Sequence, residues 1–112
     1  MKAYRAQFND YPSGWSAEGY DGVYFLAAAI KKAGSLDTDK VIAALEGLTI
    51  DAPRGKATLR KEDHQLSSDF MVGETVFEKA YPFAIVGKTE VFKADQVLYS
   101  IAEWKKAQAG NK

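Results

Sequence analysis

The chain has 112 residues, enough for one modest domain, and its 46% hydrophobic and 27% charged residues are typical of a folded protein rather than a disordered one. Lys plus Arg and Asp plus Glu each number 15, so the formal net charge is zero and no broad field attracts nucleic acid or an anionic membrane. The absence of cysteine excludes disulfides, thiol catalysis and cysteine-based metal sites, and no apolar run approaches the roughly 20 residues of a membrane span.

The first two predicted elements are helices. A short helix is expected over residues 2–10, where Tyr4 and Phe8 are four apart and share a face. This helix is expected to end before the segment 12–14, which contains a proline and a glycine. A second helix is expected over residues 16–33. Its residues are apolar nearly all round, which predicts that it is buried on most sides.

The second helix has an unusual N-terminal half. Trp15 is expected in the loop that leads into it, Ser16 is a plausible N-cap, and Glu18 adds favourable charge to the first turn. Gly19 and Gly22 lie in the helix interior, where each costs about 0.5–1 kcal/mol relative to alanine. Close approach by another element or by a ligand is the usual reason for such glycines, so a close neighbour is expected here.

The chain then changes from helical to strand periodicity. A third helix begins after Asp37, its predicted N-cap, and ends at Gly47. A short strand is expected over residues 55–60, followed by a polar loop over 61–69.

The last part of the chain is predicted to contain a hairpin and a helix. Residues 70–78 and 84–92 are β-rich and are expected to pair, and the internal glycine of each indicates a bulge or a close contact. Residues 94–110 are expected to form one amphipathic helix. Its apolar side holds Val97, Ile101 and Trp104.

These elements predict an α/β chain with too few strands for a complete doubly wound sheet. We expect a single partial domain over residues 1–112, with a helical part at 2–47, a strand-rich part at 55–93 and a C-terminal helix at 94–109. A helix that is apolar all round needs partners, and this chain supplies few. The chain is therefore expected to be a piece of something larger or to assemble with itself.

Several short motifs occur in a characteristic order. A Tyr-Asp pair lies inside the alanine-rich helix, followed by Ala-Gly-Ser with an aspartate cap, an Ala-Leu helix, a glycine that opens a strand, and then Asp-His. The residues are Tyr20, Asp21, Ala33, Gly34, Ser35, Asp37, Ala44, Leu45, Gly55, Asp63 and His64. This ordered set resembles the C-terminal part of the type I periplasmic solute-binding proteins, of which the branched-chain amino-acid receptors of ABC transporters are the best-known group. The resemblance extends from Tyr4 to about Val76 and is weaker after Glu78.

The resemblance implies a C-terminal fragment of a two-lobed type I periplasmic-binding-protein fold, with three to four helices, a short strand and a β-hairpin. Such a receptor closes around a small solute, here an amino acid or a small carboxylate, and delivers it to ABC permease subunits. It implies a periplasmic or extracytoplasmic location, although residues 1–5 lack the apolar core of a signal peptide. Two lobes need roughly 200–300 residues, so the fragment is expected to expose apolar faces and to self-associate, as a dimer.

The resemblance also implies a ligand site at the start of the second helix. Trp15 matches a ligand-facing aromatic and would form an apolar wall, with Ser16 and the N-terminal amides beside it, suited to a carboxylate. Glu18 is the third candidate contact. Each has a structural alternative: Trp15 can cover a local core, Ser16 can serve as N-cap only, and Glu18 can act only on the helix dipole. Tyr20 is expected in the core, and Asp21 is expected to bond a nearby backbone group.

No catalytic residue, metal site or cofactor is expected. Asp63 and His64 are adjacent, with Ser67 and Ser68 nearby, but neighbours on an extended chain point in opposite directions and no nucleophile elbow is present. One histidine without cysteine gives no zinc-ligand spacing, and residues 55–61 lack the P-loop spacing. The alternative to a transport receptor is a ligand-sensing regulatory domain of the same fold, and an enzyme is a distant third.

Overall fold

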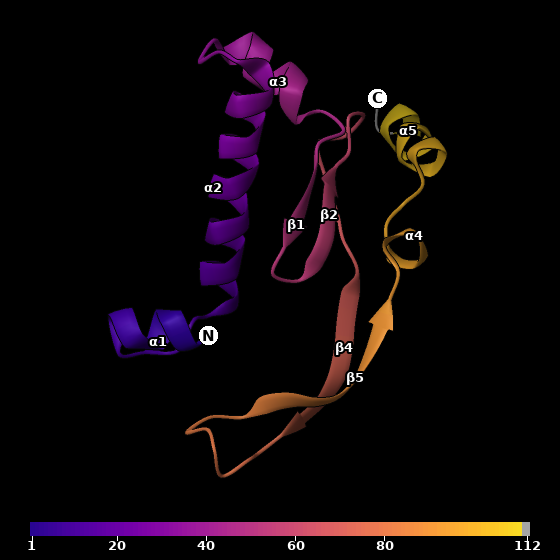
Figure 1. Ribbon diagram of the computed structural model, residues 1–112. Coiled ribbons are helices and arrows are strands. Elements are labelled where there is room, and N and C mark those ends of the chain that lie inside the picture. The colour runs from indigo at the N-terminus through magenta and orange to yellow at the C-terminus, as the bar shows by residue number, and fades with distance from the viewer. Residues whose placement is uncertain (111–112) are drawn as a thin grey trace.

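Helices occupy the first third of the chain, strands the middle and helices again the end (Figure 1). The computed structural model describes residues 1–110. The helices are α1 (Lys2–Phe8), α2 (Gly14–Ala33), α3 (Thr38–Leu45), α4 (Ala94–Val97) and α5 (Ile101–Gly110). The strands are β1 (Thr49–Ala52), β2 (Gly55–Leu59), β3 (Leu66–Ser67), β4 (Phe70–Val76) and β5 (Ile85–Phe92). The expected α/β class is confirmed, but β1 and β3 were not predicted.

Helix α2 begins earlier than the sequence suggested. Ser13 is the N-cap: its backbone is extended and its hydroxyl oxygen accepts a hydrogen bond from the Ser16 amide at 3.2 Å. The prediction that Ser16 caps the helix is therefore wrong, and Trp15 belongs to the first helical turn rather than to the preceding loop. Glu18 lies beyond that turn, so its predicted role as a first-turn charge is also wrong.

The pair α2–α3 holds the small core of the chain. The predicted cap of α3 is confirmed, since the Asp37 carboxylate accepts a hydrogen bond from the Lys40 amide at 3.1 Å. Small and branched side chains allow the two helices to pack closely. The buried cluster consists of Ala29, Val41 and Ala44, with Ile30, Ala33, Leu45 and Leu48 packed against it.

Most of α2 remains exposed, contrary to the prediction that it is buried on most sides. Tyr20, expected in the core, is 49% exposed and stacks on Tyr24 with ring centroids 4.3 Å apart. A Cβ added at Gly19 or Gly22 would meet nothing within 4 Å, so no described element makes the predicted close approach. The apolar pattern of α2 thus has no partner among residues 1–110 on these faces, which explains why burial inferred from composition was wrong.

Strands β1, β2 and β3 form an antiparallel sheet beside α2. β1 and β2 join through the two-residue turn Pro53–Arg54, and Gly55 after it has a φ of 112°, which favours glycine. The Thr49 and Thr58 hydroxyls lie 2.7 Å apart across the first pair. β1 is only four residues long and depends on this pairing, so its own sequence did not reveal it.

The predicted hairpin is confirmed as β4–β5, and so is its irregularity. Val72 pairs with Glu90 and Glu74 with Gly87, so two residues of β5 lie opposite Gly73. The positive φ of this bulge, 45°, belongs to Lys88 rather than to either glycine. Gly73 and Gly87 instead allow the two strands to approach closely, since a Cβ added at either position would collide with atoms of the opposite strand.

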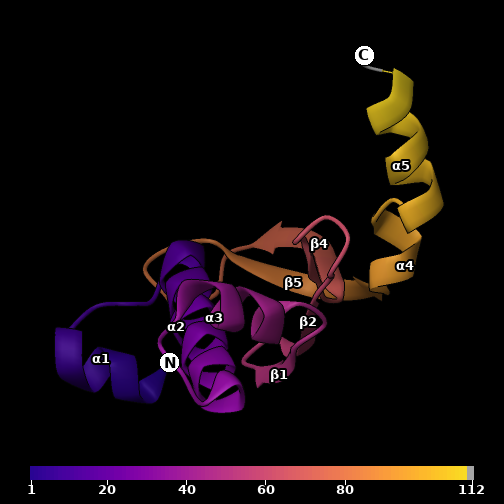
Figure 2. The same ribbon diagram turned by 90° about the horizontal axis from the view of Figure 1, so that it is seen from above.

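The single C-terminal helix predicted over 94–110 is wrong. α4 ends at Val97, Leu98 has an extended backbone, and α5 begins at Ile101 (Figures 1 and 2). Seen from above, α5 projects away from the strands (Figure 2).

The described chain is extended. Its radius of gyration is 17.5 Å and its principal extents are 49 × 36 × 23 Å. A compact domain of about 100 residues has a radius of gyration of about 13 Å. Among the helices of residues 1–110, none combines the length and the apolar composition that a membrane crossing requires.

Candidate functional site

The first turn of α2 carries two of the three predicted ligand residues. Trp15 is 82% exposed. The Ser16 hydroxyl lies 3.1 Å from that of Ser13, and its amide already donates to the same oxygen. The helix itself provides no acceptor for the amides of Gly14 and Trp15, because the first amides of a helix precede its hydrogen-bonding ladder. An apolar ring and outward amide groups thus lie together at this end of α2.

Glu18, the third predicted residue, lines a different feature. An open groove of about 930 Å³ runs between the N-terminal half of α2, the β1–β2 turn, β3 and the start of β4. Trp15 and Ser16 do not line this groove. Its apolar lining includes Phe25, Leu59, Leu66, Phe70 and Met71. The structure therefore separates Glu18 from the other two candidates.

A partly buried ion pair lies in the wall of the groove. Asp21, which is 4% exposed, accepts a hydrogen bond through Oδ2 from Arg54 Nε at 3.1 Å. Its Oδ1 has no hydrogen-bond partner among residues 1–110. The expected bond from Asp21 to a nearby backbone group is therefore wrong. Arg54 lies in the turn between β1 and β2, and the sequence analysis did not predict that hairpin. The spacing of residues 21 and 54 therefore could not predict this ion pair.

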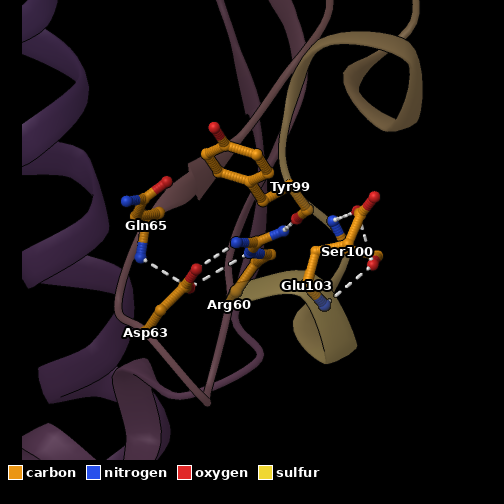
Figure 3. Close-up of polar contacts among 6 residues, drawn as sticks. All are labelled: Arg60, Asp63, Gln65, Tyr99, Ser100 and Glu103. Carbon is orange, nitrogen blue, oxygen red and sulfur yellow. Dashed lines mark hydrogen bonds and ion pairs between the residues drawn. The ribbon is translucent and has the colours of Figure 1, made fainter. Parts of the chain in front are cut away.

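Asp63 and His64 bind different partners and do not act together. The Arg60 guanidinium donates to both carboxylate oxygens of Asp63, and the Gln65 amide donates to Oδ1 at 3.1 Å (Figure 3). His64 Nε2 lies 3.3 Å from Glu46 Oε1 instead. No cluster of three or more potential metal ligands occurs within residues 1–110.

The carboxylates of Asp63 and Glu46 both have pKa values below their usual range. The Arg60 guanidinium, helped by the Gln65 amide, holds the pKa of Asp63 below its usual range despite the burial of the carboxyl. Lys61 and then His64 lower the pKa of Glu46 in the same direction.

Acid is expected to weaken the fold through Asp63. Its folded-state pKa is lower than the unfolded value of about 3.9, so the stabilisation is present above that pH and is lost as the pH falls through the folded pKa. Urea denaturation of the Asp63→Asn variant between roughly pH 5 and 2 should show a shallower loss of stability than the parent chain. Asp51→Asn, which removes an exposed ion pair with Lys56, is the control and should keep the parental slope. Equal slopes for the parent and Asp63→Asn would contradict this assignment.

Comparison with known proteins places these features in a family. The sequence pattern of a family described as periplasmic binding protein matches residues 1–80. The chain is similar to the crystal structure of an ABC-type branched-chain amino acid transporter from Rhodopseudomonas palustris CGA009. The TM-score is 0.79 and the identity 31%, over 89% of this chain and 27% of that one.

Two further solved structures match. An ABC transporter structure from Rhodopseudomonas palustris has a TM-score of 0.55 and 42% identity, over 58% of this chain and 20% of that one. A solute binding protein of an ABC transporter from Rhodopseudomonas palustris HaA2, in complex with p-hydroxybenzoic acid, has a TM-score of 0.60 and 29% identity, over 70% of this chain and 21% of that one. No curated protein sequence matches this chain.

The match of the family pattern covers well over half of the residues, and the elements of this chain superpose on part of a much longer two-lobed fold. The chain spans 27% of the length of the first of these structures, so it corresponds to a fragment of that fold. On these grounds the chain belongs to the periplasmic binding protein family.

Proposed function

We propose that this chain forms part of an extracytoplasmic receptor that captures an amino acid or a small carboxylate for an ABC importer. The family and the similar solved structures support a solute-binding role. The choice of ligand class rests on one observation of the chain. Trp15 is 82% exposed, and it lies in the same helical turn as backbone amides that have no acceptor within the helix. An aromatic ring suits an apolar body, and helix N-terminal amides suit a carboxylate.

Trp15 remains the leading ligand residue in this proposal. Ser16 contributes chiefly by holding this turn in place, because its hydroxyl and its amide are both engaged with Ser13. Glu18 would contact only the part of a ligand that reaches the groove. The p-hydroxybenzoic acid bound by one similar protein has both an aromatic body and a carboxylate, which supports the same ligand class here.

The proposed mechanism is closure of two lobes around the solute, followed by delivery to permease subunits. A ligand stabilises the closed form only to the extent that it binds that form better than the open one. The 112-residue chain alone is expected to bind such solutes weakly, because it spans 27% of the length of the first similar protein.

The direct test is a chimera in which this chain replaces the matching region of the Rhodopseudomonas palustris CGA009 protein. Calorimetry with p-hydroxybenzoate and with leucine should detect binding of at least one of them, and a neutral sugar should not bind. A folded chimera that binds no carboxylate or amino acid would contradict the proposed function.

Within that chimera, Trp15→Ala is expected to weaken binding about tenfold, or roughly 1.4 kcal/mol, because the ligand loses an apolar contact surface. Phe77→Ala is the matched control, since Phe77 is also an exposed aromatic (85%) but lies beyond β4. An equal loss of affinity in both variants would argue against a direct contact by Trp15.

The isolated chain is further proposed to self-associate through the exposed apolar side of α2, formed by Tyr20, Val23, Tyr24 and Leu26. Light scattering should then give a mass above the 12.3 kDa of one chain. Val23→Lys should return the mass to that of a monomer, whereas a parent chain that is monomeric at high concentration would exclude this association.

A further inference from the structure

The break between α4 and α5 is not caused by a proline or a glycine. Residues 94–109 contain neither proline nor glycine, and Val97, Ile101 and Trp104 recur at helical spacing. Sharp breaks in helices usually have an identifiable cause of this kind or an inserted partner. The cause of this break therefore has to be sought in contacts made by residues 98–100.

Local side chains replace part of the missing helical ladder. In a continuous helix the Glu103 amide would donate to the Tyr99 carbonyl. Here that amide donates to Ser100 Oγ at 3.2 Å, and the Ser100 amide and hydroxyl donate to Glu103 Oε2 at 2.8 and 2.7 Å (Figure 3). This reciprocal capping box starts α5 as a new helix.

The Tyr99 carbonyl, released from the ladder, accepts a hydrogen bond from a distant side chain. Arg60 Nη1 donates to it at 2.7 Å, while Nε and Nη2 of the same guanidinium donate to the Asp63 carboxylate (Figure 3). The Asp63 side chain is 1% exposed, and the Gln65 amide holds it in place. Arg60, held by Asp63 in its own turn, thus reaches the C-terminal segment across 39 positions of sequence.

The other end of the segment is attached separately. Lys93 Nζ binds Asp69 Oδ2 at 2.6 Å, and the Lys93 amide donates to Gln96 Oε1 at 2.7 Å. These contacts tie α4 to the base of the β4–β5 hairpin. A change of backbone at residues 98–100 would therefore move α5 and leave α4 in place.

We propose that residues 94–110 are a two-state element and that Arg60 is the positioning residue of its latch. In the latched state Arg60 holds the Tyr99 carbonyl and the helix is broken. In the released state the Tyr99 carbonyl accepts the Glu103 amide, α4 and α5 become one helix, and α5 points in a new direction relative to the β1–β3 sheet. This inference rests on the contacts of residues 60–65 and 93–103 and does not depend on the solute that the protein binds.

The first experiment uses Arg60→Lys in the whole chain. Lysine keeps the charge beside Asp63 but cannot donate from a rigid fork to two partners at once. Backbone chemical shifts of residues 98–100 should change to helical values. Lys61→Gln, which alters the neighbouring cation that binds Glu46, is the matched control and should leave these shifts unchanged.

A distance measurement distinguishes movement of α5 from a general loss of stability. The chain has no cysteine, so spin labels can be placed at Lys56→Cys and Gln108→Cys, both exposed positions. The parent should give one main distance between the labels, and Arg60→Lys should give a second, resolved distance. The shifts of the β1–β2 sheet should stay unchanged, which a merely destabilised chain would not show.

Ser100→Ala provides an independent variant that leaves the turn at residues 60–65 intact. It removes the capping box, so it should also increase the helical population of residues 98–100, and the double variant with Arg60→Lys should increase it further. The proposal is overturned if residues 98–100 remain non-helical and the label distance stays unchanged in these variants. If Arg60→Lys fails to fold, the same result in Ser100→Ala alone overturns it.

Discussion

Gly73→Ala is expected to destabilise the chain by about 1–3 kcal/mol, because the added methyl group has no space. Its Cβ would lie 2.7 Å from the Gly87 carbonyl oxygen and 2.7 Å from Val86 Cγ1. The carbonyl belongs to the backbone of the paired strand, so relief requires the two strands to separate at the bulge. Urea denaturation followed by circular dichroism measures the change.

Two other glycines serve as controls for this prediction. Gly87→Ala should cost less, since the atoms nearest to its Cβ, the closest at 2.8 Å, belong to the Val76 side chain and can shift more easily than a paired backbone. Gly22→Ala should stabilise the chain by about 0.5–1 kcal/mol, because it lies within α2 with nothing within 4 Å. A Gly73→Ala variant as stable as the parent would show that the β4–β5 register is not the one described.

Arg54→Ala is expected to cost about 1–3 kcal/mol, because it leaves the Asp21 carboxylate without its ion-pair partner. Removal of one partner from a fully buried pair costs more, but the Arg54 side chain is 30% exposed and water screens the pair in part. The same denaturation measurement applies.

The control for Arg54 is another ion pair of the same sheet. Lys56 binds Asp51 at 3.0 Å, but both side chains are highly exposed, so Lys56→Ala should change stability by less than about 1 kcal/mol. A double-mutant cycle with Asp21→Asn isolates the coupling between Arg54 and Asp21. Additive effects in that cycle would show that the pair contributes nothing beyond its separate side chains.

Local signals in the sequence predicted some elements well. The aspartate cap of α3 rests on an interaction between near neighbours, and the β4–β5 pairing joins two consecutive β-rich segments; both are confirmed. The glycines of the hairpin indicated a bulge, although the left-handed residue is Lys88. The cap of α2 was misplaced by one turn because Ser13 and Ser16 are equally suitable residues and only the backbone at Ser13 distinguishes them.

The candidate site was only partly predictable. Trp15 and Ser16 lie together because they are adjacent in α2, whereas Glu18 faces the groove with Arg54 and Phe70, which come from distant segments. No spacing rule joins residues 18, 54 and 70. The ligand roles of Trp15, Ser16 and Glu18 remain predictions, which the chimera would test.

The sequence by itself determined the order of helical and strand-rich parts, the hairpin pairing and the resemblance to the family, because each depends on periodicity, capping residues and motif order along the chain. Only the tertiary structure decided that α2 is largely exposed, that Arg54 pairs with Asp21, and that Arg60 binds the Tyr99 carbonyl at the break in the C-terminal helix. These last features depend on contacts between residues 33 and 39 positions apart, or on partners that the chain does not supply. A pattern of near neighbours carries no information about such contacts, because their free energy is set by which distant groups the fold brings together.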